Sequence, residues 1–416
     1  MPIEIMNNNI SDSYICRPII SVKMKEISLE SFNNTALAFA SKSKWKLKKA
    51  YYLFRVVNNS TITGIATFAA NLALKLKLPI KGIIKRTVFD HFCGGETIEE
   101  CRQVSDKMAS YNVGSILDYS VEGKDTEEAF DASLAETLKT LDNAKGNPAV
   151  PYCVFKPTGL GSALLMEKVQ LGETLNKEEG QAFERLQQRY DILCKAAFNN
   201  DVRLLIDAED SWYQITIDNL SYSLMEKYNK HRAIVFNTYQ MYRWQGLDNI
   251  KKAHQVANEK GFVLGAKLVR GAYMEVERER AAAKGYPDPI CIDKEATDKS
   301  YNDGLQYCVE NINNIELFNG THNENSVCHL TDLMKKAGIE PNDSRIFSVQ
   351  LYGMSDNISY VLADAGYNVA KYLPYGPVKY VMPYLIRRAQ ENTSVGGQSS
   401  RELTMIRQEL IRRNGQ

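Results

Sequence analysis

From about residue 112 the chain alternates short apolar runs with longer amphipathic segments. Runs of four to seven residues suit buried strands, and the segments between them have the spacing of amphipathic helices. The runs lie at residues 113–118, 152–156, 203–207, 234–238, 264–269, 315–319, 346–350 and 369–372. Strand then helix, repeated eight times over roughly 280 residues, fits a closed (β/α)8 barrel better than an open doubly wound sheet. We therefore predict an α/β protein with a helical region over residues 1–110 and a (β/α)8 barrel with a C-terminal helix over residues 111–416.

A (β/α)8 barrel forms its active site at the carboxyl ends of its strands. Polar or ionisable residues stand at or just after the end of each run: Asp118, Lys156, Asp207, Asn237, Gln240, Lys267, Arg270, residues 321–323, Gln350, Tyr352 and Tyr372. Ordinary turns favour Gly, Asn and Asp, whereas Lys, Gln, His and Tyr are common in this set. Each residue alone has a plainer explanation, such as a surface lysine at Lys156 or a helix cap at Asp207. As one ordered set at one end of a barrel, they predict a functional site.

The segment 372–392 carries a second pattern. Tyr384, Arg387, Arg388 and Glu391 are spaced i, i+3, i+4 and i+7, so a helix places them on one face. Adjacent guanidinium groups repel each other unless an anion lies between them, and a carboxylate bound by both is the usual solution. The pattern alone also fits a solvated helix in which Arg387 pairs with Glu391. Pro383 predicts a kink in this helix or a helix that begins there.

Composition excludes several classes of protein. A net charge of +1 argues against a nucleic-acid binder. Eight cysteines without a C-x-x-C pair, and five histidines without an H-E-x-x-H motif, give little support for a metal site, and no metal is predicted. No secretory signal is evident at the start and no apolar run approaches 18 residues, so we expect a cytoplasmic protein without a membrane span.

Residues 31–88 form a basic segment without Asp or Glu. Lysines and arginines interleave there with aromatic and aliphatic residues such as Trp45, Tyr51, Tyr52 and Ile83. Such a segment can lie on an anionic lipid surface. A packed helical region with a solvated basic face explains the same pattern.

Several pieces of the chain, in their order, resemble the proline dehydrogenase family. The pieces are SILD (115–118) with Glu122 after it, VFK (154–156), IDAE (206–209), NTYQ (237–240), KLVRGAY (267–273), THN (321–323), QLYGM (350–354), YLP (372–374) and YLIRRAQEN (384–392). KLVRGAY and Y-x-x-R-R-x-x-E-N are the most specific. The resemblance covers about residues 112–395, and the segment before 110 contributes little.

The resemblance implies a flavoenzyme with FAD over the mouth of the barrel. Its reaction is the oxidation of L-proline to 1-pyrroline-5-carboxylate, with electrons passed to a membrane quinone. The implied partners are therefore L-proline, a quinone and, for the product, a downstream pyrroline-carboxylate dehydrogenase. An anionic membrane surface is a further candidate partner, which extends the expected cytoplasmic location to a peripheral one on the inner membrane.

The resemblance also assigns roles to residues. Asp207, which would orient Lys156, and Lys267, beside the reactive flavin nitrogen, are the catalytic candidates. Substrate would be bound by Lys156, Leu268, Tyr273, Tyr372, Tyr384, Arg387 and Arg388. Glu391 would brace the arginines, and Glu122 would pair with Arg387 as a gate. The cofactor would be held by Ala208, Asn237, Lys267, Arg270, Gly271, Ala272, Thr321, His322, Asn323 and Gln350.

Two positions depart from the bacterial pattern of the family. Lys267 stands where arginine is frequent, and Asn237 stands where glutamine is frequent; the lysine is similar to the eukaryotic branch. Two other functions remain open from the residues themselves. Lys156 or Lys267 could form a Schiff base in an aldolase, and a barrel without chemistry could serve as a lipid-associated scaffold.

Overall fold

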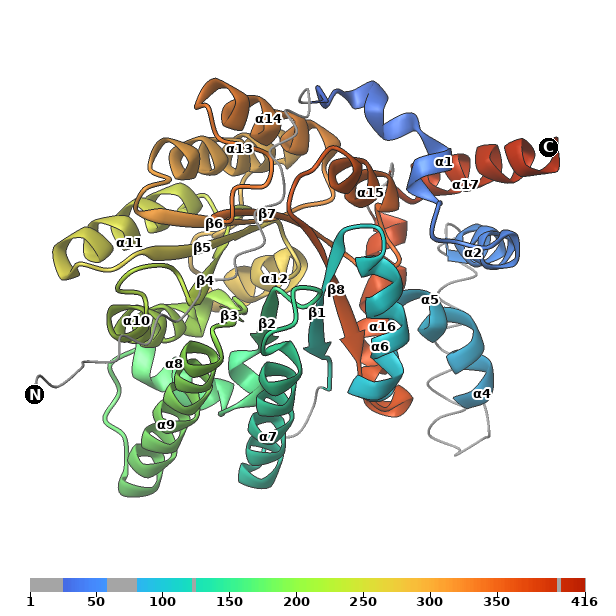
Figure 1. Cartoon of the computed structure of the whole chain (residues 1–416). Helices are drawn as coiled ribbons and strands as arrows, with labels where there is room; N and C mark the ends of the chain where they lie inside the picture. The colour runs from blue at the N-terminus through green and yellow to red at the C-terminus, as the bar shows by residue number, and fades with distance from the viewer. Residues whose placement is uncertain (1–24, 58–80, 122–124, 395–397, 416) are drawn as a thin grey trace, which may run out of the picture.

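The barrel predicted from the eight apolar runs is present in the computed structural model, which describes residues 25–57, 81–121, 125–394 and 398–415. The strands are β1 (Val113–Tyr119), β2 (Tyr152–Phe155), β3 (Arg203–Ile206), β4 (Val235–Gln240), β5 (Leu264–Val269), β6 (Ile315–Gly320), β7 (Ile346–Leu351) and β8 (Val369–Tyr375). They form one parallel sheet in the order β1-β8-β7-β6-β5-β4-β3-β2 (Figure 1). The backbone N–H of Ser115 in β1 donates to the carbonyl of Ala149, just before β2, at 2.8 Å. This bond draws the two edge strands together and nearly closes the ring.

Successive side chains of each strand alternate between the barrel interior and the surrounding helices. The interior is filled by an aromatic and aliphatic cluster that includes Tyr152, Phe236, Phe318 and Tyr372. The opposite faces of the strands join a larger apolar cluster shared with the helices. Only the polar side chains on the inward-facing positions of a strand can therefore reach the mouth.

Helices on the outside cover the barrel. Those that follow strands are α7 (Glu127–Ala144), α9 (Lys177–Asn200), α10 (Ser211–Tyr228), α11 (Gly246–Lys260), α13 (Lys294–Glu310), α14 (Glu324–Lys336) and α15 (Asp356–Asp364). Two additional helices, α8 (Ala163–Gln170) and α12 (Met274–Lys284), lie after β2 and β5. Side-chain caps start several of these helices; Asn176 and Glu179, for example, form a capping box at the start of α9.

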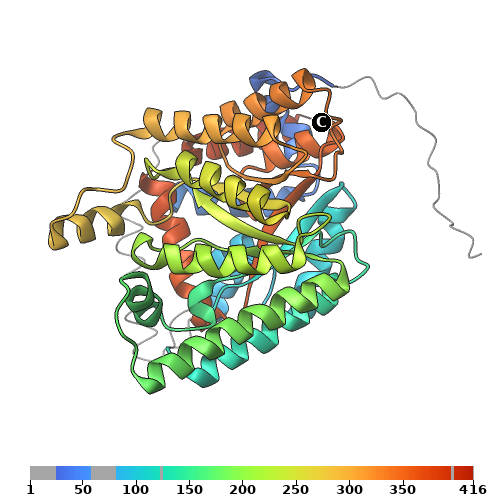
Figure 2. The same cartoon turned by 90° about the vertical axis from the view of Figure 1, so that its left-hand side faces the viewer.

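The helix after β8, α16 (Val378–Ser394), does not join the outer ring. It runs across the end of the barrel toward which the strands point (Figure 2). Its buried residues, among them Val381, Tyr384 and Leu385, pack against Phe89 and Phe92. The place beside β1 is filled by α6 (Ile98–Ala109), which precedes the barrel and packs on it through a shared apolar cluster. Because α6 covers that side, α16 is available to cover the mouth.

Pro383 lies inside α16. The helix begins at Val378, five residues before the proline, so the expectation of a helix start at Pro383 is wrong and the proline is an interior one.

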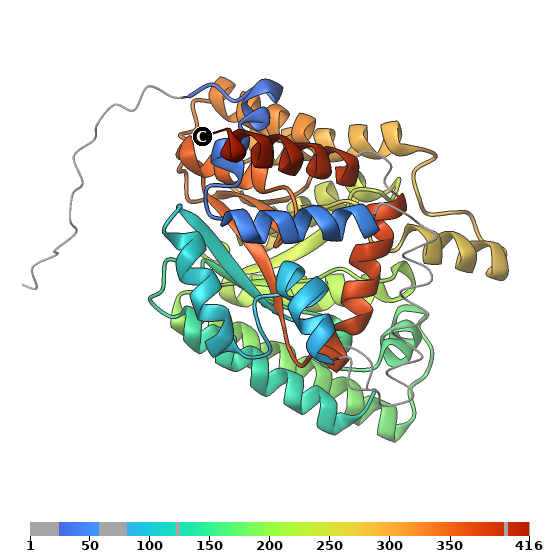
Figure 3. The ribbon, with the colours of Figure 1, turned by 90° about the vertical axis from the view of Figure 1, so that its right-hand side faces the viewer.

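The N-terminal elements pack on one side of the barrel. They are η1 (Leu29–Asn33), α1 (Thr35–Ala38), α2 (Lys44–Val57), α4 (Lys81–Ile84), η2 (Lys85–Phe89) and α5 (Asp90–Phe92). Helix α2 lies along the last helix, α17 (Gln398–Asn414), through Leu47, Phe54 and Ile406 (Figure 3). A domain boundary near residue 110 stays a prediction. Among the described residues, no helix is both long and apolar enough to cross a membrane.

Gly265 in β5 lies where the register of the barrel leaves no space for a side chain, so a substitution there tests the register. A Cβ there would come within 2.4 Å of the Val235 carbonyl oxygen and 2.8 Å of the Phe236 ring. Gly265→Ala should therefore lower the free energy of unfolding by about 2 kcal/mol or more. Gly180→Ala in α9, where a new Cβ meets nothing within 4 Å, should raise it by about 0.5–1 kcal/mol. Urea unfolding of both variants measures the difference, and equal effects would contradict the register.

Candidate active site

Four polar side chains meet inside the mouth of the barrel. Asp207 accepts from the Lys156 ammonium at 2.8 Å through Oδ2 and from the Lys267 ammonium at 2.5 Å through Oδ1. Lys267 also donates to the Tyr372 hydroxyl at 2.6 Å. Lys156 and Asp207 directly follow β2 and β3, whereas Lys267 and Tyr372 lie within β5 and β8. Each takes an inward-facing place in the alternation of its strand. The structure thus brings together four of the residues that the strand ends predict.

The pKa values of the three charged side chains are shifted in different directions. Burial alone would raise the pKa of Asp207, but Lys156 and Lys267 outweigh it and hold the pKa below its ordinary value. Burial opposes the charge of Lys156, yet Asp207 and Asp118 hold its pKa well above the ordinary value. For Lys267 burial wins, and its pKa is lowered. Lys267 is therefore the ammonium that loses its proton more readily.

Helix α16 brings cationic side chains to the same mouth. Arg388 is buried, and its guanidinium lies 5.2 Å from the centre of the Tyr384 ring. Arg387 is half-buried. Burial and Glu209 raise the pKa of Tyr273, while Lys156 and Arg387 act in the opposite direction, so Tyr273 lies within electrostatic reach of both cations.

The pattern of Tyr384, Arg387 and Arg388 thus lies above the strand ends. Glu391 belongs to α16, but its side chain and the whole of Glu122 lie outside the described residues.

The loops after β5, β6 and β7 are joined by Arg270 and His322. The Arg270 guanidinium donates to Asp298 at 2.8 Å and to the Thr321 hydroxyl at 2.7 Å. It also lies 3.8 Å from the centre of the Tyr301 ring. Burial, Lys371 and Arg388 lower the pKa of His322 to about 3, so its ring is neutral at physiological pH, and it is hydrogen-bonded to the Ser355 hydroxyl.

Four more of the predicted cofactor residues lie in the loops after β3, β5 and β6. Asn323 caps α14 by accepting from the N–H of Ser326 at 3.1 Å. Gly271 and Ala272 are exposed in the loop after β5, and Ala208 is buried beside Asp207. The predicted residues that face the mouth therefore frame a polar opening.

Three predicted site residues face away from the mouth. Leu268 packs outside the barrel, with its Cδ1 3.3 Å from where a Cβ on Gly304 of α13 would lie. Asn237 donates to Asp218 of α10 at 2.8 Å. Gln350 accepts from the Ser359 hydroxyl of α15 at 2.8 Å and donates to the Thr321 carbonyl at 3.1 Å.

The expectations that Leu268 closes the substrate pocket and that the side chains of Asn237 and Gln350 contact a cofactor are corrected. The cause is the two-residue alternation of strands, because each of the three follows an inward-facing neighbour in its strand: Lys267, Phe236 and Val349.

Gln240 is a site residue that the role assignment omitted. It is buried at the end of β4, and its Nε2 donates to the Glu209 carbonyl at 2.6 Å. Its Oε1 is buried and has no hydrogen-bond partner among the described residues. Continuing the inward alternation of β4 from Phe236 through Thr238 leads to Gln240, which the strand-end pattern names although the resemblance gives it no role.

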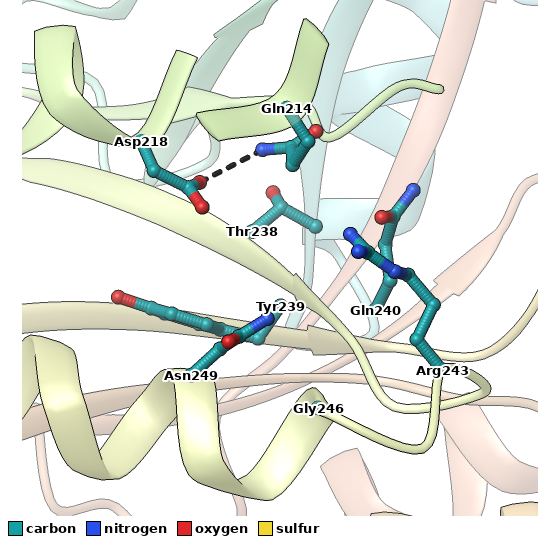
Figure 4. A pocket seen from close by; sticks show the side chains of 8 residues that line it. All are labelled: Gln214, Asp218, Thr238, Tyr239, Gln240, Arg243, Gly246 and Asn249. Carbon is teal, nitrogen blue, oxygen red and sulfur yellow. Dashed lines mark hydrogen bonds between the residues drawn. The ribbon is translucent and has the colours of Figure 1, made fainter. Parts of the chain in front are cut away.

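A small pocket lies beside Gln240. It is lined by Gln214, Asp218, Thr238, Tyr239, Gln240, Arg243, Gly246 and Asn249 (Figure 4). The buried Arg243 Nε, like Gln240 Oε1, lacks a partner among the residues that the structure describes. A donor and an acceptor left open side by side suit a polar ligand or an ordered water. In the described ranges, no group of three or more His, Cys, Asp or Glu side chains could hold a metal ion.

Comparison with known proteins assigns the family. The model of the proline dehydrogenase family matches residues 101–401. The chain belongs to the proline dehydrogenase family. It is 33% identical to proline dehydrogenase 1, mitochondrial, of Dictyostelium discoideum, over 91% of this chain and 74% of that protein. It is 30% identical to the hydroxyproline dehydrogenase of Xenopus laevis, over 90% of this chain and 88% of that protein.

A solved structure supports the fold assignment. Proline utilization A from Bdellovibrio bacteriovorus matches with a TM-score of 0.68 and 19% identity, over 90% of this chain. The match spans only 40% of that longer chain. At this identity the likeness concerns the fold alone, which is that of the barrel described above.

Asp207 should be the residue on which the mouth of this proline dehydrogenase family barrel most depends for stability. Asp207→Asn leaves the buried Lys267 ammonium and the part-buried Lys156 ammonium without a carboxylate, so it should lower the free energy of unfolding by about 3 kcal/mol. Asp201→Asn removes the partner of Arg232 in a surface pair, where the aspartate side chain is 81% exposed, and should change it by less than about 1 kcal/mol. Urea unfolding at pH 7 compares them; a silent Asp207→Asn would refute the role given to this carboxylate.

Proposed function

We propose that the protein oxidises L-proline to 1-pyrroline-5-carboxylate with FAD, as a step of proline breakdown. The observation that carries the proposal is that α16 crosses the mouth of a barrel of the proline dehydrogenase family that holds the Lys156–Asp207–Lys267 group (Figure 2). From there Arg387 acts, against burial, to lower the pKa of Tyr273, and Arg388 acts with burial to lower that of His322, so both cations lie within electrostatic reach of the mouth. A small zwitterion with one carboxylate suits such a site, because two guanidiniums and an ammonium face one anion.

The carboxylate end of proline would be held by Arg387, Arg388 and Lys156. Tyr273, Tyr372 and Tyr384 would pack against the ring and exclude water, without the contribution once expected from Leu268. Binding at two ends fixes the ring carbon next to the nitrogen, so that its C–H bond faces the acceptor. Excess positive charge at the mouth also favours the neutral amine, whose lone pair assists departure of the hydride as the C=N bond forms.

The residues present suit FAD. The open acceptor at Gln240 Oε1 matches an N–H donor of a flavin ring, and the polar loops around the mouth provide donors for a dinucleotide. The residues that would hold it are Gln240, Ala208, Arg270, Gly271, Ala272, Thr321, His322 and Asn323. Hydride acceptance is the chemistry that FAD supplies when bound. Lys267 would stabilise the negative charge that the reduced flavin ring carries, and Asp207 keeps this lysine in place.

The aldolase alternative has one observation in its favour, the lowered pKa of Lys267. A Schiff base, however, needs a free amine, and the Lys267 nitrogen is held by Asp207 and Tyr372. Family membership also points to oxidation. A scaffold without chemistry is likewise disfavoured, because the charged group at the mouth is complete in its lysines and arginines.

We further propose that a membrane quinone accepts the electrons and that the protein lies peripherally on an inner membrane. Helix α2 supports this proposal, since Trp45 is 74% exposed and Tyr52 64% exposed beside exposed lysines, and Ile83 of α4 is 67% exposed. Aromatic and basic side chains together suit an anionic lipid surface. The product would pass to a pyrroline-carboxylate dehydrogenase.

An absorbance spectrum tests the activity directly. The purified protein should be yellow and should bleach when L-proline is added, whereas a colourless protein that takes up no flavin would refute the proposal.

Arg388→Met should leave flavin content nearly unchanged but raise KM for proline steeply, since it loses roughly 2–5 kcal/mol of charge-assisted binding. Arg232→Met serves as the control, because Arg232 pairs with Asp201 before the strands begin, at the end of the barrel opposite the mouth; equal KM effects would count against a specific role of Arg388.

Tyr384 should set the preference between proline and 4-hydroxyproline. Its buried phenol stands beside Arg388, where it would crowd a hydroxyl on the proline ring. Proline should be preferred by the wild type, and Tyr384→Ser should narrow the ratio of kcat/KM values. Tyr384→Phe, which keeps the ring, should narrow it less. Ratios that stay the same in all three proteins would remove Tyr384 from substrate selection.

A further inference from the structure

Two buried glutamates outside the assigned set form matching clamps. Glu209 accepts from the backbone N–H of Thr158 at 2.8 Å and from its hydroxyl at 2.6 Å. Glu277 accepts from the backbone N–H of Ser211 at 2.7 Å and from its hydroxyl at 2.6 Å. Both glutamates are at most 5% exposed. Each carboxylate therefore holds one residue by two hydrogen bonds in a buried setting, where such bonds are costly to lose.

The first clamp fixes the turn that follows Lys156. Thr158 lies in η3 (Pro157–Gly159), a short helix for which Lys156 is the N-cap. With both polar hydrogens of Thr158 held by Glu209, the backbone two residues beyond Lys156 has a defined position. Lys156 is thus placed by its backbone as well as by its bond to Asp207.

The second clamp fixes α12. The buried residues of this helix are Glu277 and Ala281, so it lacks the apolar stripe that normally attaches a helix. Its other attachments include Arg280, which pairs with Glu167 of α8 and whose guanidinium lies 4.2 Å from the centre of the Trp212 ring. Tyr273 is the N-cap of α12, and the helix projects beyond the end of the barrel (Figure 2). The bond of Glu277 to Ser211 therefore bears directly on the position of Tyr273.

A short loop joins the clamps. Glu209 lies between β3 and α10, and Ser211, two residues further on, is the first residue of α10. The Glu209 N–H donates to Gln214 at 2.9 Å, and its carbonyl accepts from Gln240 at 2.6 Å. Gln214 belongs to α10, the helix that Ser211 begins, so its bond ties Glu209 to that helix and a displacement of Ser211 is passed to Glu209.

We infer that Glu209 and Glu277 are positioning residues that couple α12, with Tyr273, to the turn that carries Lys156. The two walls of the substrate site are then set together, although no bond joins them directly among the described residues. The inference rests on the proposed function for the roles of Tyr273 and Lys156, but the coupling itself is a property of the fold.

Hydrogen exchange tests the coupling without substrate. Thr158→Val removes one bond of the first clamp and does not touch α12, yet the amides of residues 274–284 should exchange about threefold faster or more in the full-length protein. Ser223→Ala is the control, since it removes a hydroxyl bonded to the Leu220 carbonyl within α10, and should leave these amides unchanged. An unchanged exchange rate at α12 in Thr158→Val would overturn the coupling.

Ligand binding tests the positioning. Cyclopentanecarboxylate, a proline analogue without the amine, can be titrated calorimetrically into the flavin-loaded protein. Thr158→Val and Ser211→Ala should each weaken its Kd roughly threefold to tenfold, and the double variant should lose less than the product of the two factors. Unchanged Kd values, or factors that multiply fully, would overturn the positioning role. If the wild type binds no analogue while exchange at α12 still responds to Thr158→Val, the proposed function fails and the coupling stands.

The pH dependence of analogue binding distinguishes a positioning role of Glu209 from a merely structural one. Burial raises the pKa of its carboxyl to about 7, against the opposing effect of the Thr158 bonds. The other titratable groups that face it are Lys156, Asp207, Tyr190, Tyr213 and Tyr273. As pH falls through about 7, the neutral carboxyl holds Thr158 less well, so the analogue should bind severalfold more weakly at pH 6 than at pH 8. Glu209→Gln should flatten this dependence; an undiminished dependence would assign it to another group.

Discussion

The Asp207 carboxylate, shared by two lysines inside the barrel, is the interaction on which the candidate site depends. Without it, Lys156 and Lys267 would face each other in a buried space, and burial of like charges is strongly unfavourable. The carboxylate favours the charged form of both lysines and holds the pKa of Lys156 well above its ordinary value, but burial outweighs it at Lys267 and lowers the pKa of that lysine. The two lysines that share one carboxylate are thus cations of different character, suited to binding an anion and to stabilising charge that forms during reaction.

Helix placement completes this arrangement. In a regular barrel the last helix would pack outside the sheet, but here α6 covers β1 and α16 crosses the mouth. Arg387 and Arg388, which follow the last strand in the sequence, are thereby brought to the mouth of the barrel. The N-terminal helices contribute indirectly, since Phe89 and Phe92 form the apolar surface on which α16 rests.

Much of this organisation could be predicted from the sequence, for identifiable reasons. The barrel follows from eight apolar runs, and the central group from ionisable residues at their ends. Leu268, Asn237 and Gln350 were misplaced because family motifs name positions, whereas the alternation of each strand decides which face a side chain occupies. Gln240 is named by the strand-end pattern but receives no role from the resemblance. The pairing of Glu209 with Thr158 and of Glu277 with Ser211 has no local pattern, since these partners lie 51 and 66 residues apart.

The central claim is that cations at the mouth of the barrel grip the carboxylate of an amino acid above the lysine pair. A crystal structure of the protein with FAD and cyclopentanecarboxylate tests it most directly. The account predicts carboxylate oxygens within hydrogen-bond distance of Arg387 and Arg388, with the ring against Tyr372 and Tyr384. A carboxylate bound elsewhere, with both guanidiniums turned toward solvent, would contradict it.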